Sequence, residues 1–261
     1  MKASRKSIIL IIATGIVVYM YTLVARLPAA LVYQWAHPFL KGITLERVSG
    51  TLWSGQVDQI MVQNTPQPLH LPKTTWHINP AALLTGKLSA HVQMGSLSSP
   101  VESDGLITLS AEGLTLTDFQ ADTSASWLSG LLPHSTIPGE LSARINLSID
   151  NLRMQGNQCQ DLAGNITVTQ GQFTSSVGNF DLGTSKIALS CQSQQLMAMI
   201  KQSSPELTTE ASLSLSAEGR YGIKGTISQG SNTSDTLQQG LRMLGRPDAD
   251  GDYPINWQGR I

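Results

Sequence analysis

The sequence predicts a mainly β protein in which one N-terminal transmembrane helix precedes an antiparallel β-sheet with a few short helices. Three observations support this class. The run Ser7–Ala25 holds no charged residue, apolar residues alternate with polar ones through much of the remaining chain, and Gly, Pro, Asn and Asp separate the alternating runs. Charged residues are only 13% of the chain, and the formal net charge is −1. Because little positive charge is available to neutralise phosphates, nucleic-acid binding is not expected.

The uncharged run Ser7–Ala25 would extend roughly 28 Å as a helix, close to the thickness of a bilayer core. Lys2, Arg5 and Lys6 precede this run, whereas only Arg26 follows it closely. Since basic residues favour the cytoplasmic side, we expect a cytoplasmic segment 1–6, a membrane anchor 7–25 and a non-cytoplasmic remainder. The alternatives are a cleaved signal peptide, which has a shorter apolar core, and a buried core helix.

Residues 26–41 predict a membrane-proximal helical connector that starts near Pro28 and ends at Pro38. Tyr33 and Trp35 on this helix are expected at interfacial depth, where aromatic side chains are enriched. A β-rich region should then occupy residues 42–261.

Near the start of that region, Gly50 and Gly55 lie on either side of Trp53. Glycines at this spacing predict tight turns or a close approach of backbone, covered by an aromatic side chain.

The clearest helix signal is the run from Asn79 to Gly86. Asn79 suits the N-cap, Pro80 the first helical position and Gly86 the residue after the end. Three further helices are expected, at Ser124–Leu132, Gln194–Lys201 and Asp235–Leu244.

Alternation of apolar and polar residues predicts the strands, and the longest such run is Leu141–Ile149. We expect their apolar face to be covered by the short helices, with an open apolar groove as the alternative. The other predicted strands are Trp76–Ile78, Leu88–Met94, Ile107–Ala111, Leu114–Leu116, Ile166–Val168, Ile187–Cys191, Leu213–Ala217 paired with Tyr221–Ile227, and Tyr253–Trp257.

The pentapeptide LSAEG occurs twice, at Leu109–Gly113 and at Leu215–Gly219. Each copy follows one predicted strand and precedes another. This repetition predicts two related halves of the β region, at about 42–150 and 151–261.

Cys159 and Cys191 are the only two cysteines, and both follow the predicted anchor. An even pair in an oxidising compartment predicts a disulfide, with two buried thiols as the alternative. Neither zinc-ligand spacing nor an HExxH, GxSxG, P-loop or GxGxxG motif occurs, so we expect no catalytic residue, metal or cofactor. The acidic run Asp248–Asp252 is expected to form a turn rather than a calcium loop.

Several stretches, taken together and in order, resemble the protein N family of the bacterial type II secretion system. They are RLPAALV at Arg26–Val32, LERVSGTLWSG at Leu45–Gly55, WHINPAALLTG at Trp76–Gly86 with Lys87–Val92 after it, LGRPD at Leu244–Asp248, and Gly251–Gly259 before a terminal Ile261. The resemblance covers the whole chain. It implies a single-pass inner-membrane protein with a periplasmic bulk, which contacts other secretion subunits during export of folded proteins and is not an enzyme.

The GTLW and NPxxLLxG patterns are also similar to those of AsmA-type proteins, whose sheets curve into apolar grooves linked to lipid transport. This looser resemblance implies a curved sheet, and it implies lipid handling as the alternative function.

Overall fold

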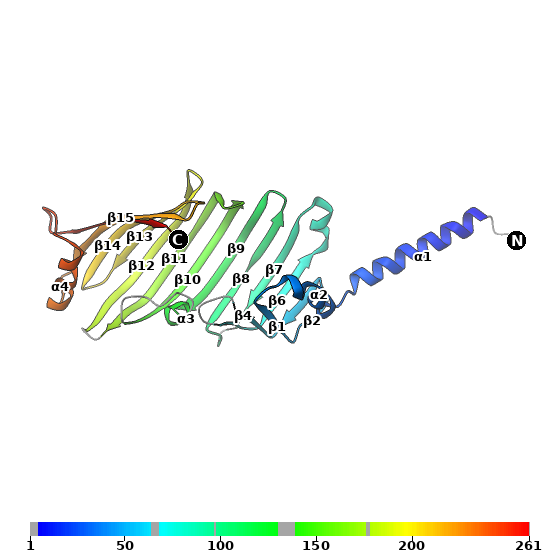
Figure 1. The fold of residues 1–261 in the computed structure, drawn as a ribbon, viewed down its shortest axis with the longest axis horizontal. Helices are drawn as coiled ribbons and strands as arrows, with labels where there is room; N and C mark the ends of the chain where they lie inside the picture. The colour runs from blue at the N-terminus through cyan, green and yellow to red at the C-terminus, as the bar shows by residue number, and fades with distance from the viewer. Residues whose placement is uncertain (1–4, 64–67, 97, 130–138, 176–177, 261) are drawn as a thin grey trace.

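A computed structural model shows the fold of the chain (Figure 1), and it describes residues 5–63, 68–96, 98–129, 139–175 and 178–260. The chain begins with helix α1 (Arg5–Ala25), helix α2 (Ala29–Ala36) and the 3-10 helix η1 (His37–Phe39). Among the residues that the structure describes, no helix combines the length and the hydropathy that a membrane crossing requires. In α1 the structure describes side chains only from Ile12 onward. The membrane anchor therefore stays a prediction.

Most of the chain forms one antiparallel sheet of 13 strands in the order β16-β15-β14-β13-β12-β11-β10-β9-β8-β7-β6-β3-β2. Figure 1 shows these strands side by side, with α1 extending away from the end where β2 lies. The predicted mainly β, antiparallel class is confirmed. The strands are β2 (Ser49–Gly50), β3 (Ser54–Val57), β6 (Thr74–Asn79), β7 (Leu88–Met94), β8 (Val101–Ser110), β9 (Gly113–Ser124), β10 (Glu140–Gln155), β11 (Gln158–Ser175), β12 (Gly178–Gln192), β13 (Gln195–Ser203), β14 (Leu207–Leu215), β15 (Arg220–Gln229) and β16 (Tyr253–Arg260).

A second, three-stranded sheet has the order β1-β4-β5 and is built from β1 (Ile43–Glu46), β4 (Gln59–Val62) and β5 (Leu69–Leu71). The predicted boundary near residue 150 falls inside β10, in the middle of the larger sheet. The two LSAEG segments lie at the β8–β9 and β14–β15 turns. The prediction of two related halves stays a prediction.

The strand register aligns apolar residues into rows that cross the large sheet. Successive side chains of a strand point to opposite faces, so residues paired across strands share a face. One row consists of Phe119, Ile149, Gly164, Leu189, Ala198, Leu213, Ile223 and Trp257. The next row on that face consists of Ala121, Leu147, Ile166, Ile187, Ile200, Ala211, Gly225 and Ile255. We call this side of the sheet the apolar face.

In the part of the chain that the structure describes, the short helices lie at the ends of strands and do not extend along the apolar face, contrary to our expectation. The 3-10 helix η2 (Pro80–Thr85) forms as predicted, because the Asn79 carboxamide accepts the N–H of Ala81 and Gly86 adopts a left-handed φ of 71°. Its Leu84 nevertheless points to solvent, with 90% of its surface exposed. Helix α3 (Ala125–Ser129) directly follows β9, and α4 (Asp235–Leu244) lies between β15 and β16 in the chain. Figure 1 places both at the ends of strands.

Two of the predicted helices need comment. The segment Gln194–Lys201 was expected to be helical, and this prediction is wrong because it lies almost wholly in β13. Leu196, Ala198 and Ile200 recur every second residue, which suits a strand whose alternate side chains face the same apolar surface. The predicted helix Ser124–Leu132 forms as α3, and its last residues, 130–132, lie outside the described residues.

Gly55 shows why glycine is needed beside Trp53, as the sequence predicts. A Cβ atom built at Gly55 would lie 2.4 Å from Cζ2 of Trp76 and 2.8 Å from the carbonyl oxygen of Ser49. The absence of a side chain therefore lets the indole ring of Trp76, on β6, pack flat on β3.

We predict that Gly55→Ala lowers the free energy of unfolding by about 1–3 kcal/mol, because the added methyl group must displace the Trp76 ring or the backbone. Gly240→Ala in α4 is the matched control, since a Cβ there meets nothing within 4 Å and alanine favours a helix by up to about 1 kcal/mol. Urea unfolding of both variants measures the difference. Equal stability of Gly55→Ala and wild type would show that the contact is unimportant.

Candidate functional site

The predicted site residues Cys159 and Cys191 lie on the neighbouring strands β11 and β12. The structure brings their sulfur atoms together at disulfide spacing, with Cα atoms 5.6 Å apart. Cys159 is only 2% exposed and forms a core cluster with Ile149 and Leu162. The partly buried apolar residues packed against this cluster are Leu116, Phe119, Leu147, Leu152, Met154, Leu189, Cys191 and Leu196.

The cysteine pair therefore lies among the packed apolar side chains of the sheet. A covalent link between β11 and β12 at this point would hold the middle of the sheet together, which makes its role structural.

The apolar face runs across the large sheet from β9 to β16. None of the residues in its two apolar rows is charged, and most of them are half-buried. Charged residues lie on the opposite face, where Lys186, Lys201 and Glu210 form a row and Lys201 pairs with Glu210 at 3.7 Å. The sheet is thus strongly two-sided, and one side is suited to apolar contact.

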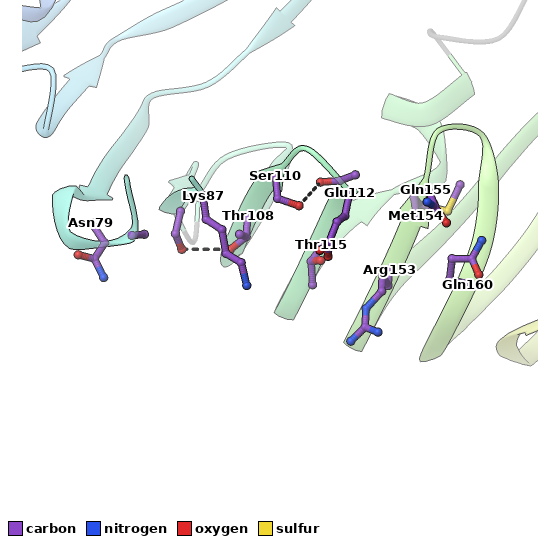
Figure 2. A pocket seen from close by; sticks show the side chains of 13 residues that line it. Asn79, Lys87, Thr108, Ser110, Glu112, Thr115, Arg153, Met154, Gln155 and Gln160 are labelled. Carbon is purple, nitrogen blue, oxygen red and sulfur yellow. Dashed lines mark hydrogen bonds between the residues drawn. The ribbon is translucent and has the colours of Figure 1, made fainter. Parts of the chain in front are cut away.

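The face opposite the apolar one, which we call the polar face, carries a cavity of about 740 Å³. It lies over β7, β8, β9 and β10, near the β8–β9 and β10–β11 turns. Figure 2 shows side chains from neighbouring strands lying along this cavity. Ser89 and Thr108 share a hydroxyl–hydroxyl hydrogen bond of 3.1 Å, and the Ser110 hydroxyl donates to the Gly113 carbonyl oxygen at 3.4 Å. The charged and amide side chains that line it are Asn79, Lys87, Glu112, Arg153, Gln155 and Gln160.

This polar cavity has contact groups and lacks a catalytic arrangement among the described residues that line it. Its hydroxyl groups have no histidine within the lining to act as a general base. The sequence did not single out this cavity, because Ser and Thr alternating on a strand are also the ordinary pattern of a solvated sheet face.

Among the described residues outside this cavity, Glu218 has a pKa that departs from its usual value, and it lies at a turn. The hydroxyl of Ser216 and the backbone, with a smaller contribution from Arg220, hydrogen-bond to Glu218 and lower its pKa. Glu218 is exposed at the β14–β15 turn, so this shift in pKa describes the turn and not a reactive centre.

The open edge of the large sheet is the remaining candidate surface. β16 pairs with β15 on one side and ends the strand order on the other, as far as the described residues go. Edge strands present backbone N–H and C=O groups that another chain can pair with.

The fold and its surfaces can now be set beside known proteins. The family model described as Type II secretion system (T2SS), protein N matches residues 41–256. The chain belongs to this family. This match confirms the resemblance that the sequence showed, and it makes the protein a component of the type II secretion system.

Curated relatives agree along the length of the chain. A type II secretion system protein N of Aeromonas hydrophila is 28% identical over 257 residues, which covers 98% of this chain and all of the relative. The protein of that name from Vibrio cholerae is 27% identical and covers 94% of this chain and 95% of its own. One from Pectobacterium carotovorum is 22% identical over 87% of each chain. No solved structure matches this family member.

The disulfide stays a prediction. Its presence or absence would also show whether the cysteines lie in an oxidising compartment. We expect a thiol-blocking reagent added to the denatured protein of acid-quenched cells to label neither Cys159 nor Cys191 before reduction and both afterwards, because disulfides persist in oxidising compartments. Cys159→Ser is the control, since it leaves Cys191 free to react. Labelling of the unreduced wild-type protein would return the pair to buried thiols and would argue against a periplasmic sheet.

Proposed function

We propose that this protein is a non-enzymatic, single-pass inner-membrane component of the type II secretion system that works through protein–protein contacts in the periplasm. In this layout residues 1–6 are cytoplasmic, residues 7–25 anchor the chain, residues 26–41 connect, and residues 42–261 are periplasmic. Family membership supports the secretion role. The uncharged run after Lys2, Arg5 and Lys6 supports the anchor and its orientation.

The observation that carries the contact proposal is the unpaired side of β16. Pro254 has no N–H and lies opposite Thr226 in the β15–β16 ladder. Because N–H groups of alternate residues point to the same side of a strand, Pro254 and Asn256 direct their nitrogen atoms to the same side. Pro254 cannot donate to β15, so this side is the open edge, and the N–H of Asn256 is offered to a partner.

Asn256→Pro tests this docking edge, because it removes one outward donor and leaves the donors to β15 in place. We expect the variant to fold, as judged by circular dichroism, and to lower the amount of exported protein in the culture medium of cells that carry no other copy. Ile255→Pro is the matched control, because it removes a donor to β15 and should weaken the sheet itself. A folded Asn256→Pro protein with unchanged secretion would contradict docking at this edge.

The uncovered apolar face favours a second candidate function, the handling of lipid. An apolar surface without charged residues in its rows can hold acyl chains as well as another protein. In this case phospholipid should co-purify in stoichiometric amount with the gently extracted protein.

Ile145→Asp separates this second function from the first. Ile145 on β10 is half-buried and pairs with Val168, while the exposed Asn146 points to the opposite face. If lipid occupies the apolar face, Ile145→Asp should remain folded and lose the lipid, whereas Asn146→Asp keeps it, because only the first places a carboxylate against acyl chains. Mass spectrometry of extracted lipid measures the outcome. Wild-type protein free of lipid would exclude this function.

A further inference from the structure

Helix α2 and the following η1 carry apolar residues on two sides. On the inner side Ala29 is 5% exposed, and the hydroxyl of Tyr33 accepts the N–H of Leu45 at 3.0 Å. On the outer side Leu31, Trp35 and Phe39 follow one another at four-residue intervals and are 41%, 66% and 85% exposed. We call these last three residues the outer stripe.

The outer stripe is unusual for a helix in water. A helix that packs on one side normally presents polar residues on the other, because exposed apolar area is unfavourable. Here the outward positions hold a leucine, a tryptophan and a phenylalanine instead. Tryptophan in particular is enriched where a protein meets the boundary between bilayer and water.

Hydrogen bonds hold this stripe next to the end of α1. The indole Nε1 of Trp53 donates to the carbonyl oxygen of Val24 at 2.8 Å, in the last turn of α1. The N–H of Leu52 donates to the carbonyl oxygen of Leu27 at 2.8 Å. Trp76 on β6 in turn donates through Nε1 to the carbonyl oxygen of Leu52 at 2.9 Å.

These bonds join α1, the β2–β3 hairpin and the large sheet in one chain of contacts. Pro28 forms an isolated antiparallel bridge with Thr51, and α2 begins at the next residue, Ala29. The position of the outer stripe relative to the end of α1 is therefore set by the two indole hydrogen bonds and by the backbone bond from Leu52 to Leu27, and is not left to a loose linker.

We propose that the outer stripe lies in the interfacial layer of the same lipid bilayer that α1 enters, so that α2 and η1 rest on the membrane surface and seat the sheet against it. This proposal rests on the proposed function, which makes α1 the membrane anchor. The occupant is lipid because the stripe directly follows α1 and because the exposed Arg26 lies between α1 and the stripe, where basic residues favour anionic headgroups. Tyr33 is not part of this contact, contrary to our expectation, because its hydroxyl and ring are turned toward Leu45 and His37.

The test is a depth measurement on the full chain in vesicles of phosphatidylcholine and phosphatidylglycerol. A nitroxide spin label is attached to Trp35→Cys or Phe39→Cys without reductant, and its collisions with oxygen, which enters membranes, and with a water-soluble nickel chelate are compared. Ile16→Cys in α1 is the bilayer reference, with a starting exposure of 55%. Lys201→Cys on the charged face of β13 is the aqueous reference, because the Lys201 side chain is 73% exposed. Unsubstituted chain gives the background labelling.

We expect the oxygen-to-nickel ratio at positions 35 and 39 to fall between those of the two references, well above the ratio at position 201. Ala30→Cys, which is exposed on another side of α2, should give the aqueous ratio, because the helix lies with one side down. Aqueous ratios at 35 and 39 beside a bilayer ratio at 16 would overturn the outer-stripe proposal and leave the anchor standing. An aqueous ratio at position 16 would overturn the anchor of the proposed function, and with it the seat of the stripe.

Discussion

The in-register antiparallel ladder is the constraint on which the rest of this structure depends. Thirteen strands pair in one order, and each pair keeps its register over most of its length. Because side chains alternate along a strand, the ladder puts all residues of one row on one face. A shift of one residue in a single strand would move its isoleucines and leucines to the charged side. The separation of an apolar face from a charged face follows from this register alone.

The pairing register of the strands shifts only at β-bulges, where one strand has an extra residue. One such bulge involves Asp118 on β9 and Asp150 on β10. Asp118 has a φ of 48°, which an aspartate accepts more readily than most residues. The register shifts between Asp104 and Leu106 of β8 against β9, and between Ile149 and Asn151 of β10 against β11. The extra residue lets Leu152 return to the apolar face three positions after Ile149. Both bulge positions lie outside the apolar packing, which suits the charged side chains of the two aspartates.

Three features bear on function: the family to which the chain belongs, the exposed surfaces of the large sheet, and the hydrogen bonds between the sheet and the end of α1. Membership of the type II secretion system protein N family identifies the machine. The open edge at β16 and the apolar face lie on the sheet, while Trp53 and Leu52 tie the other end of the sheet to α1. The sheet is bonded to the end of α1 near β2, and its β16 edge is unpaired among the described residues. This arrangement holds the β16 edge at a set distance from the end of α1.

The sequence by itself determined the features that depend on neighbours along the chain. Alternation predicted the strands, the cap and stop residues Asn79 and Gly86 predicted η2, and Leu213–Ala217 was correctly matched with Tyr221–Ile227. Ordered motifs also identified the family. Only the tertiary structure decided that Gln194–Lys201 is mostly a strand, that Tyr33 turns inward while Trp35 turns outward, and that the short helices leave the apolar face open. These outcomes depend on which strand lies beside which and on what covers each face, and a local pattern of residues carries no information about partners that are distant in the chain.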